Sequence, residues 1–251
     1  MPNDLAGKYA LVTGGSRGIG RAIAENLGGR GATVAIHYGS DDETAESAVR
    51  LVEERGGAAF AIRADLSSPQ APAQLWEQYD RHAPHADIVI NNAGILGGRT
   101  PFSEVDPTTF DLVQAVNARA PFFLLQHGLS RLADGGRVVN ISTRFTHGSY
   151  NAALLPYSMS KAAIDALTFA LAKDLAPRRI TVNAVGPGAT ATDMNAARLA
   201  TEEGRAAMTT DSPLGRIGQP ADVAAVVGFL VSAEAGWVTG QWLDASGGSL
   251  L

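Results

Sequence analysis

Two residues whose types and spacing could support proton transfer stand past the middle of the chain. Tyr157 and Lys161 are four positions apart, at the start of an apolar run that predicts a helix ending near Leu175. On that helix they lie one turn apart on the same face. A phenol ordinarily has a pKa near ~10, and a neighbouring ammonium group lowers that pKa. The pair could therefore exchange a proton with a carbonyl or alcohol oxygen. Taken alone, such a pair is more often an ordinary surface Tyr and Lys.

A glycine-rich segment near the amino terminus predicts a phosphate-binding loop. Residues 8–13 form an apolar run typical of a buried strand, and residues 14–20 follow as GGSRGIG. The next residues have helical periodicity, with Ile23, Ala24 and Leu27 on one side. A glycine loop between a strand and a helix presents backbone N–H groups and a helix N-terminus, which suit a pyrophosphate. The glycine spacing is GxxxGxG and not the commoner GxGxxG.

The end of the second predicted strand bears on the choice of dinucleotide. Residues 33–38 read as this strand, and its end carries Tyr38 and Ser40 where many dinucleotide sites place an acid that holds the ribose 2′-hydroxyl. Without that carboxylate a 2′-phosphate is tolerated, and Arg17 could pair with it. The pattern therefore favours NADP(H) over NAD(H). Three acids follow at once, and we expect Ser40 and Glu43 to form a capping box there.

Strand and helix patterns alternate along the whole chain. This alternation predicts a parallel sheet with right-handed crossovers and helices on both faces. No repeat, low-complexity tract or linker divides the 251 residues. Besides the two strands above, the predicted strands are residues 58–63, 86–90, 135–142, 180–185 and 241–244.

Composition excludes several classes of function. The formal net charge is −5 without a basic stripe, which gives no electrostatic case for nucleic acid. Cysteine is absent and the five histidines form no metal-binding constellation, so no metal site is expected. No apolar run is long enough to span a membrane, and the amino terminus lacks the order of a secretory signal. We therefore expect a cytoplasmic protein.

Six motifs in this order and spacing resemble those of the short-chain dehydrogenase/reductase (SDR) family, over essentially the whole chain. The resemblance implies a Rossmann-type, doubly wound sheet of seven parallel strands in a three-layer α/β/α domain spanning residues 1–251. It also implies a small substrate lobe at about 190–218, and a homotetramer or homodimer. The motifs are residues 13–20, 91–94, Asn117, 140–143, 157–161 and 187–188.

The resemblance also implies a role for each matching residue. Tyr157 would be the acid/base of a carbonyl–alcohol interconversion, and Lys161 would lower its pKa and hold the nicotinamide ribose. Asn117 would support a water that links Lys161 to bulk solvent. The implied cofactor contacts are Gly14, Ser16, Arg17, Ile19 and Gly20 at the phosphates, Asp65 and Leu66 at the adenine, Asn91, Ala93 and Gly94 on the adenosine side, and Pro187, Gly188, Thr190 and Thr192 at the nicotinamide.

One position departs from the family pattern. The family places a second serine after Asn-Ile-Ser to hydrogen-bond the substrate oxygen, and here that position is Thr143. The separation from Thr143 to Tyr157 is also one residue longer than is usual. Threonine offers the same hydroxyl with a stiffer χ1, and neighbouring residues of a strand face opposite ways. We favour Thr143 over Ser142 as the residue that holds the substrate oxygen, and Ser142 stays the alternative.

Three readings of the function remain open at this stage. The first is an NADP(H)-dependent oxidoreductase that interconverts a carbonyl and an alcohol, with an unidentified small-molecule substrate. The second is an NAD(H)-dependent alcohol or polyol dehydrogenase, and the third is a non-catalytic dinucleotide sensor. The intact Tyr157, Lys161 and Asn117 argue against the sensor. The helix behind Tyr157 is apolar nearly all round, which predicts cover on two sides, one of them from a partner subunit or another helix of this chain.

Overall fold

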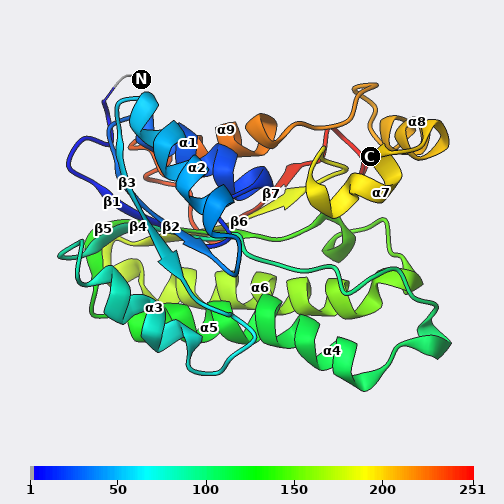
Figure 1. The fold of residues 1–251 in the computed structure, drawn as a ribbon, viewed down its shortest axis with the longest axis horizontal. Helices are drawn as coiled ribbons and strands as arrows, with labels where there is room; N and C mark the ends of the chain where they lie inside the picture. The colour runs from blue at the N-terminus through cyan, green and yellow to red at the C-terminus, as the bar shows by residue number, and fades with distance from the viewer. Residues whose placement is uncertain (1–2) are drawn as a thin grey trace.

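The computed structural model describes residues 3–251 as a three-layer α/β/α arrangement around one sheet (Figure 1). The sheet has seven strands in the order β3-β2-β1-β4-β5-β6-β7, and all neighbours are parallel. The predicted doubly wound, Rossmann-type sheet is confirmed. Residues 1–2 of the predicted single domain lie outside the described residues. The strands are β1 (Tyr9–Val12), β2 (Thr33–Tyr38), β3 (Ala58–Arg63), β4 (Ala86–Asn91), β5 (Leu132–Ile141), β6 (Thr181–Pro187) and β7 (Trp242–Ala245).

The predicted strands are all present, and the largest shift in their ends is in β5. This strand begins at Leu132 and not at Gly135. Its pairing with β4 is irregular at this point, because Ala86 faces Leu132 whereas Ile88 faces Arg137. The extra residues are 132–134, and they are followed by Gly135 at a positive φ of 76°. A glycine irregularity of this kind interrupts the alternation on which strand prediction depends.

Helices cover both faces of the sheet (Figure 1). Neighbouring strand residues alternate between the two apolar cores: Leu11 packs in one core and Val12 in the other. On α1 the predicted apolar face, including Ile23 and Leu27, is fully buried. The helices of one face are α1 (Gly18–Gly28), α2 (Asp42–Glu54) and α9 (Pro220–Leu230), and those of the other are α3 (Ala71–Tyr79), α4 (Pro107–Gln114), α5 (Ala120–Gly128) and α6 (Leu155–Asp174).

The strand order reverses direction between β1 and β4. The chain runs from β1 outward to β3, and then returns to β4 on the other side of β1. Loops from the two halves diverge at this switch point and leave a crevice at the carboxyl ends of the strands. Two short helices, α7 (Ala196–Leu199) and α8 (Glu202–Thr210), lie near the carboxyl terminus within the predicted lobe (Figure 1).

The start of α2 differs from the expected capping box. The N-cap is Asp41, whose carboxylate accepts a hydrogen bond from the Thr44 N–H at 3.0 Å. The prediction that Ser40 and Glu43 form the cap is therefore wrong by one position. Ser40 and Asp41 both have short polar side chains suited to capping, and the helix begins one residue later than predicted, at Asp42. This leaves Ser40 free to line the crevice.

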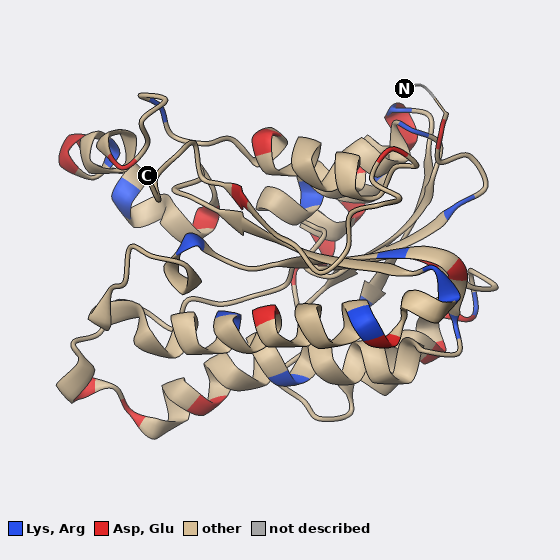
Figure 2. Cartoon of the chain, turned by 180° about the vertical axis from the view of Figure 1, so that it is seen from behind, with Lys and Arg blue, Asp and Glu red and all other residues tan. Residues whose placement is uncertain are grey.

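The outer face of α6 is exposed among residues 3–251. Ile164, Thr168 and Ala172 are buried toward the sheet, whereas Phe169 is 46% exposed and Ala166 is exposed too. Lys, Arg, Asp and Glu are interspersed along the fold, without a continuous basic face in the view of Figure 2. No helix among residues 3–251 combines the length and the apolar character needed to cross a membrane.

Candidate active site

A cavity of about 650 Å³ occupies the crevice at the carboxyl ends of the strands. Its walls come from the glycine loop, the ends of β2, β3, β5 and β6, the start of α6 and the lobe. The sequence therefore brings almost all the predicted site residues to one cavity. The predicted residues that line it are Gly14, Ser16, Arg17, Ile19, Tyr38, Ser40, Asp65, Leu66, Ala93, Gly94, Ser142, Thr143, Tyr157, Lys161, Pro187, Gly188, Thr190 and Thr192.

The glycine loop forms an open cradle at the start of α1. Gly14 and Gly18 have positive φ angles of 62° and 55°, which favour glycine. A Cβ atom on Gly14 would come within 3.0 Å of the Ala93 Cα. The N-cap residue, Arg17, makes no side-chain capping bond, and the first turn of α1 has no acid. The first N–H groups of α1 thus remain available for an anion, so this loop fits a dinucleotide pyrophosphate.

His37 fixes the back of the glycine loop. Its Nδ1 accepts a hydrogen bond from the Gly14 N–H at 3.1 Å, and its Nε2 lies 3.0 Å from the Ala64 carbonyl oxygen. The Nδ1 acceptor role requires the proton on Nε2, which then donates to Ala64. Burial lowers the pKa of His37 to about 4, so the ring is neutral at physiological pH. We infer that His37 holds the loop to the ends of β2 and β3.

Two predicted cofactor residues lie outside the cavity wall. Gly20 faces the loop, where an added Cβ would collide with the Gly14 carbonyl oxygen. Asn91 is buried, and its Nδ2 donates to the Asn140 Oδ1 at 2.7 Å. Asn91 is the last residue of β4 and points into the sheet layer, and its neighbour Asn92 lines the cavity instead. Both predicted residues support the wall from behind.

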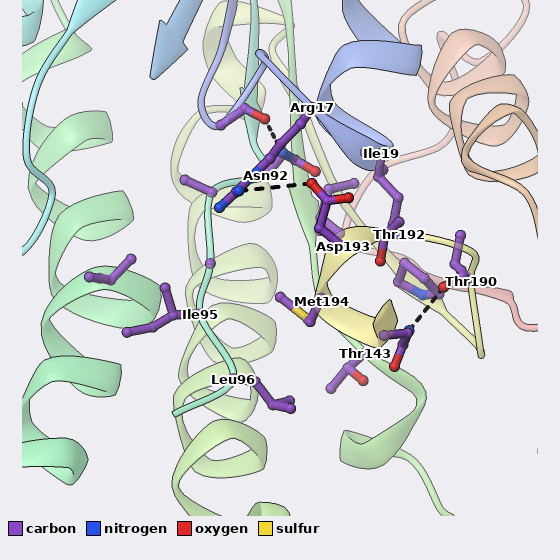
Figure 3. Close-up of a pocket in the computed structure, with 18 of the residues that line it drawn as sticks. Arg17, Ile19, Asn92, Ile95, Leu96, Thr143, Thr190, Thr192, Asp193 and Met194 are labelled. Atoms are coloured by element: carbon purple, nitrogen blue, oxygen red, sulfur yellow. Dashed lines mark hydrogen bonds and ion pairs between the residues drawn. The ribbon is translucent and has the colours of Figure 1, made fainter. Parts of the chain in front are cut away.

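The acids after β2 are occupied by other groups. Asp41 caps α2, and Asp42 lies 3.6 Å from the Arg63 guanidinium. Arg17 extends into the cavity with its side chain 71% exposed, and its one ion-pair partner among the described residues is Asp193 of the lobe, at 3.8 Å (Figure 3). A pair at this distance and exposure is weak. Arg17 can therefore turn to a phosphate beside Ser40.

Tyr157 and Lys161 both point into the cavity from the first turns of α6. The Lys161 Nζ donates to the Ile141 carbonyl oxygen at 2.7 Å and lies 5.9 Å from the centre of the Tyr157 ring. Thr143, two residues after the end of β5, has its side chain beside the Tyr157 phenol and lowers the pKa of that group. These contacts place two hydroxyl groups and one ammonium group on the same wall. That set can donate a proton and a second hydrogen bond to one substrate oxygen.

The electrostatics of the pair differ from the expectation. Burial raises the pKa of Tyr157 to about 12, and the hydrogen bond with Thr143 opposes that rise. Burial also lowers the pKa of Lys161 to about 8, opposed by the nearby Asp165 carboxylate. The four-residue spacing on the helix predicts that Lys161 lowers the pKa of Tyr157. In this fold burial is the largest influence on both pKa values, and the side chain that opposes the rise for Tyr157 is Thr143.

Asn117 lies in a π-helical turn between α4 and α5, at Ala115–Arg119. Its side chain is fully buried, exchanges two 2.8 Å hydrogen bonds with the backbone of Ile95, and donates to the Ser160 Oγ at 3.0 Å. Gly94 separates Asn117 from Lys161, and a Cβ there would lie 3.4 Å from the Lys161 Nζ. Asn117 thus fixes the loop beside Lys161. Single-turn π-helices are frequent at functional sites.

Ser142 and Thr143 have different surroundings. The Ser142 hydroxyl is buried and lies beside the Asp165 carboxylate, whose pKa it lowers. The Thr143 hydroxyl instead contacts Tyr157 and accepts a long 3.5 Å bond from the Phe145 N–H. This arrangement supports Thr143 as the residue that holds the substrate oxygen.

The two ends of the cavity that are predicted to hold the adenine and the nicotinamide are also built by backbone contacts. Asp65 accepts a hydrogen bond from the Ser67 N–H at 2.9 Å, which holds the pKa of its carboxyl below the usual value. At the other end, a Cβ on Gly188 would come within 2.7 Å of the Ser246 Cα. The Thr190 hydroxyl donates to the Gly188 carbonyl oxygen at 3.1 Å.

The comparison with known families decides the membership of this chain. Residues 14–249 match a family described as enoyl-(acyl carrier protein) reductase, of the short-chain dehydrogenase type. The chain belongs to the SDR family. Versicolorin reductase 1 of Aspergillus parasiticus, an SDR relative, is 41% identical over 98% of this chain and 97% of its own. The chain is accordingly an oxidoreductase.

Solved SDR structures resemble the whole chain. Angucycline C-6 ketoreductase LanV with bound NADP is 42% identical, with a TM-score of 0.94 over 100% of this chain and 98% of that one. Landomycin C-6 ketoreductase LanV with bound NADP and rabelomycin is 41% identical, with a TM-score of 0.89 over 99% and 98%. The similarity therefore covers the seven-stranded fold over almost its full length.

Sequence reasoning missed several residues of this SDR cavity. Its apolar walls include Ile95 and Leu96, from the loop after β4, and Met194 from the lobe (Figure 3). Arg99 and Arg198 also line it. The loop after β4 could have been searched, because loops at the carboxyl ends of parallel strands line the crevice. Nothing in the spacing signals Arg198. Within residues 3–251 no cluster of three or more acidic or histidine side chains could hold a metal ion.

Proposed function

We propose that this protein is an NADPH-dependent ketoreductase that reduces a ketone on an aromatic, polycyclic substrate to an alcohol. The observation that carries the proposal is the shared wall of Tyr157, Thr143 and Lys161, which faces a cavity continuous with the glycine loop. The proposal is supported by LanV, whose structures hold NADP and, in one case, rabelomycin. The apolar walls, with Ile95 and Phe145, suit a flat aromatic compound.

Each residue would have a distinct part in this reaction. Thr143 would donate a hydrogen bond to the ketone oxygen and orient it, and Tyr157 would give that oxygen its proton. Lys161 would hold the nicotinamide ribose and keep positive charge beside the phenol, which favours proton release. Asn117 would fix the route by which Lys161 is reprotonated. The nicotinamide group, when bound, would supply the hydride to the ketone carbon.

We propose NADP(H) as the cofactor in preference to NAD(H). The end of β2 itself has no carboxylate to accept the ribose 2′-hydroxyl. The Asp41 carboxylate, which also lines the cavity, accepts the N-cap bond of α2, and Asp42 forms a weak exposed ion pair with Arg63. Arg17 and Ser40 line the same region. A 2′-phosphate there would gain a charge-assisted contact from Arg17. The binding of NADP by LanV supports this choice.

We also propose that the protein assembles into a homodimer or homotetramer through the outer faces of α4, α5 and α6. Large apolar side chains are exposed there, including Phe122 (47%) and Met159 (49%). Several large apolar side chains exposed on one face are typical of a protein–protein interface. Light scattering of the purified protein tests this point, and a monomer at micromolar concentration would contradict it. The cytoplasmic location stays a prediction from the sequence.

The test of the function is the consumption of NADPH with a panel of ketones. Bicyclic and tricyclic aromatic ketones, aliphatic ketones, sugars and simple polyols would be compared at equal concentration, with NADPH and with NADH. We expect reduction of the aromatic ketones and a higher kcat/KM with NADPH. Turnover restricted to polyols and NAD would contradict the proposal. Binding of NADPH without turnover of any substrate would favour the sensor.

A further inference from the structure

A second cavity, of about 460 Å³, opens beside the active-site cavity and shares part of its wall. The two cavities have Arg99, Arg144, Phe145 and Arg198 in common. Arg144 follows Thr143 directly, so the second cavity begins one residue beyond the wall that holds the substrate oxygen. The other residues of its wall are Ser149, Tyr150, Asn151 and Asp211. A substrate that enters the active site from this side passes through both cavities.

Three guanidinium groups but only one carboxylate face the second cavity. Arg144 is buried and pairs with Asp211 at 2.7 Å. Among residues 3–251 neither Arg99 nor Arg198 has a side-chain ion pair or hydrogen bond. The side chains of this wall therefore carry a net charge of +2, within a protein whose formal net charge is −5.

The positive groups lie close enough to affect each other. Burial lowers the pKa of Arg99 below the ordinary value for arginine, and the charges of Arg198 and Arg144 lower it further, whereas Asp211 opposes them. Exposed arginines on an ordinary surface spread apart into water. Here three come from distant segments, namely the loop after β4, the short helical turn after β5 and helix α7. Their charges repel one another, and an anion bound between them would offset that repulsion.

We propose that Arg99 and Arg198 bind an oxyanion carried by the ketone substrate, at the end remote from its reacting carbonyl. This proposal rests on the proposed ketone reduction, and names a class of substrate for it: an aromatic ketone with a carboxylate. Arginine presents a planar fork that matches carboxylate oxygens. Arg144 is already held by Asp211 and positions the wall between the two centres. Phe145 and the exposed Tyr150 offer aromatic surface for the part in between.

The test compares an acid with its ester. The probes are 6-acetyl-2-naphthoic acid and its methyl ester, which differ in charge but share the ring and the ketone. Calorimetric titration of the NADP⁺ complex gives a dissociation constant for each probe. We expect the acid to bind at least about tenfold more tightly, which corresponds to one charge-assisted hydrogen bond. Salt should reduce this preference, since the cavity is open to solvent.

Two charge-removing variants and one control locate the effect. Arg99→Gln and Arg198→Gln should each lower the ratio of acid to ester affinity several-fold, and Arg198→Lys should restore part of it. Arg81→Gln removes the same charge from an exposed position before β4, at the amino ends of the strands and so away from the cavities. It should keep the ratio of acid to ester affinity. An acid that binds no better than its ester, or failure of both to bind, would overturn the proposal. So would variants that weaken both probes equally.

A second arm identifies the kind of oxyanion. 6-Acetyl-2-naphthyl phosphate replaces the carboxylate with a phosphate monoester on the same ring. Tighter binding of this probe than of the acid would transfer the assignment from carboxylate to phosphate and overturn the class named above. Turnover of the neutral ester with NADPH, measured in parallel, reports on ketone reduction itself. The ester could be reduced while the acid shows no preference, and this result would reject the anion site and leave the proposed function intact.

Discussion

Asp165 offers a way to measure how the protein controls the charge on Lys161. It lies one helical turn beyond Lys161 on α6, is 5% exposed, and neither carboxylate oxygen has a hydrogen-bond partner that meets distance and angle criteria. His147 approaches it at 3.7 Å. Burial raises the pKa of Asp165, and the contacts of Ser142, Thr146, His147 and Lys161 oppose that rise. The carboxylate in turn raises the pKa of Lys161 against the effect of burial.

The size of the effect follows from Coulomb's law. Groups four apart on a helix are roughly 6 Å apart, and two unit charges at that distance with an effective dielectric constant of about 20 interact by about 3 kcal/mol. This corresponds to about two pH units at full ionisation of both groups. The shift is smaller than this because Asp165 also interacts with His147 and is partly protonated. Asp165→Asn should therefore move the alkaline limb of the kcat/KM profile about one pH unit lower, from near the Lys161 pKa of about 8.

The sign follows from the charge removed. Without the carboxylate the Lys161 ammonium is less favoured, its pKa falls, and the rate declines at a lower pH. The assay is NADPH oxidation with one aromatic ketone between pH 6 and 10. Asp174→Asn, at the exposed end of the same helix, is the matched control and should leave the limb in place. If Asp165→Asn lowers the Tm but leaves the alkaline limb of the pH profile in place, the electrostatic reasoning is refuted and Asp165 has only a packing role.

Two further pairs of substitutions test other parts of the site. Thr143→Ala should lower kcat by roughly 10²-fold, as expected for loss of one hydrogen-bond donor to the substrate oxygen, whereas Ser142→Ala should have a much smaller effect. Steady-state kinetics compare them, and the reverse ranking would assign the role to Ser142. Gly20→Ala should lower stability by roughly 1–3 kcal/mol because its Cβ collides with the Gly14 carbonyl oxygen. Thermal unfolding measures this against Gly39→Ala, whose Cβ meets no atom within 4 Å; equal Tm values would contradict the collision.

The layout of the sheet could be predicted because apolar strands alternate with amphipathic helices along the chain. The glycine loop likewise follows directly after its strand, so its position could be read without the structure. The sequence could not show which of two neighbouring residues takes a given position. Asp41 and not Ser40 caps α2, and Asn92 and not Asn91 lines the cavity. Each pair differs by one position, and its outcome depends on the residue at which helix α2 begins or strand β4 ends.

The sequence also could not predict how deeply the catalytic pair is buried, or which residues far apart in the chain line the same cavity. The spacing of Tyr157 and Lys161 predicts a mutual effect on their charges, but the desolvation that raises one pKa and lowers the other arises from the packing around them. Arg99 and Arg198 are separated by about a hundred residues and line the same cavities only because the loop after β4 and helix α7 lie at the same end of the sheet. No local pattern in the sequence could signal that arrangement.

Tyr157→Phe tests the central claim most directly. The variant removes one hydroxyl from a buried side chain and leaves the ring in place, so NADPH affinity, followed by nicotinamide fluorescence, should be nearly unchanged. NADPH-dependent reduction of the best aromatic ketone should fall by roughly 10²–10⁴-fold, the usual contribution of a general acid. This combination would support Tyr157 as the proton donor. Retention of most of the turnover would contradict it.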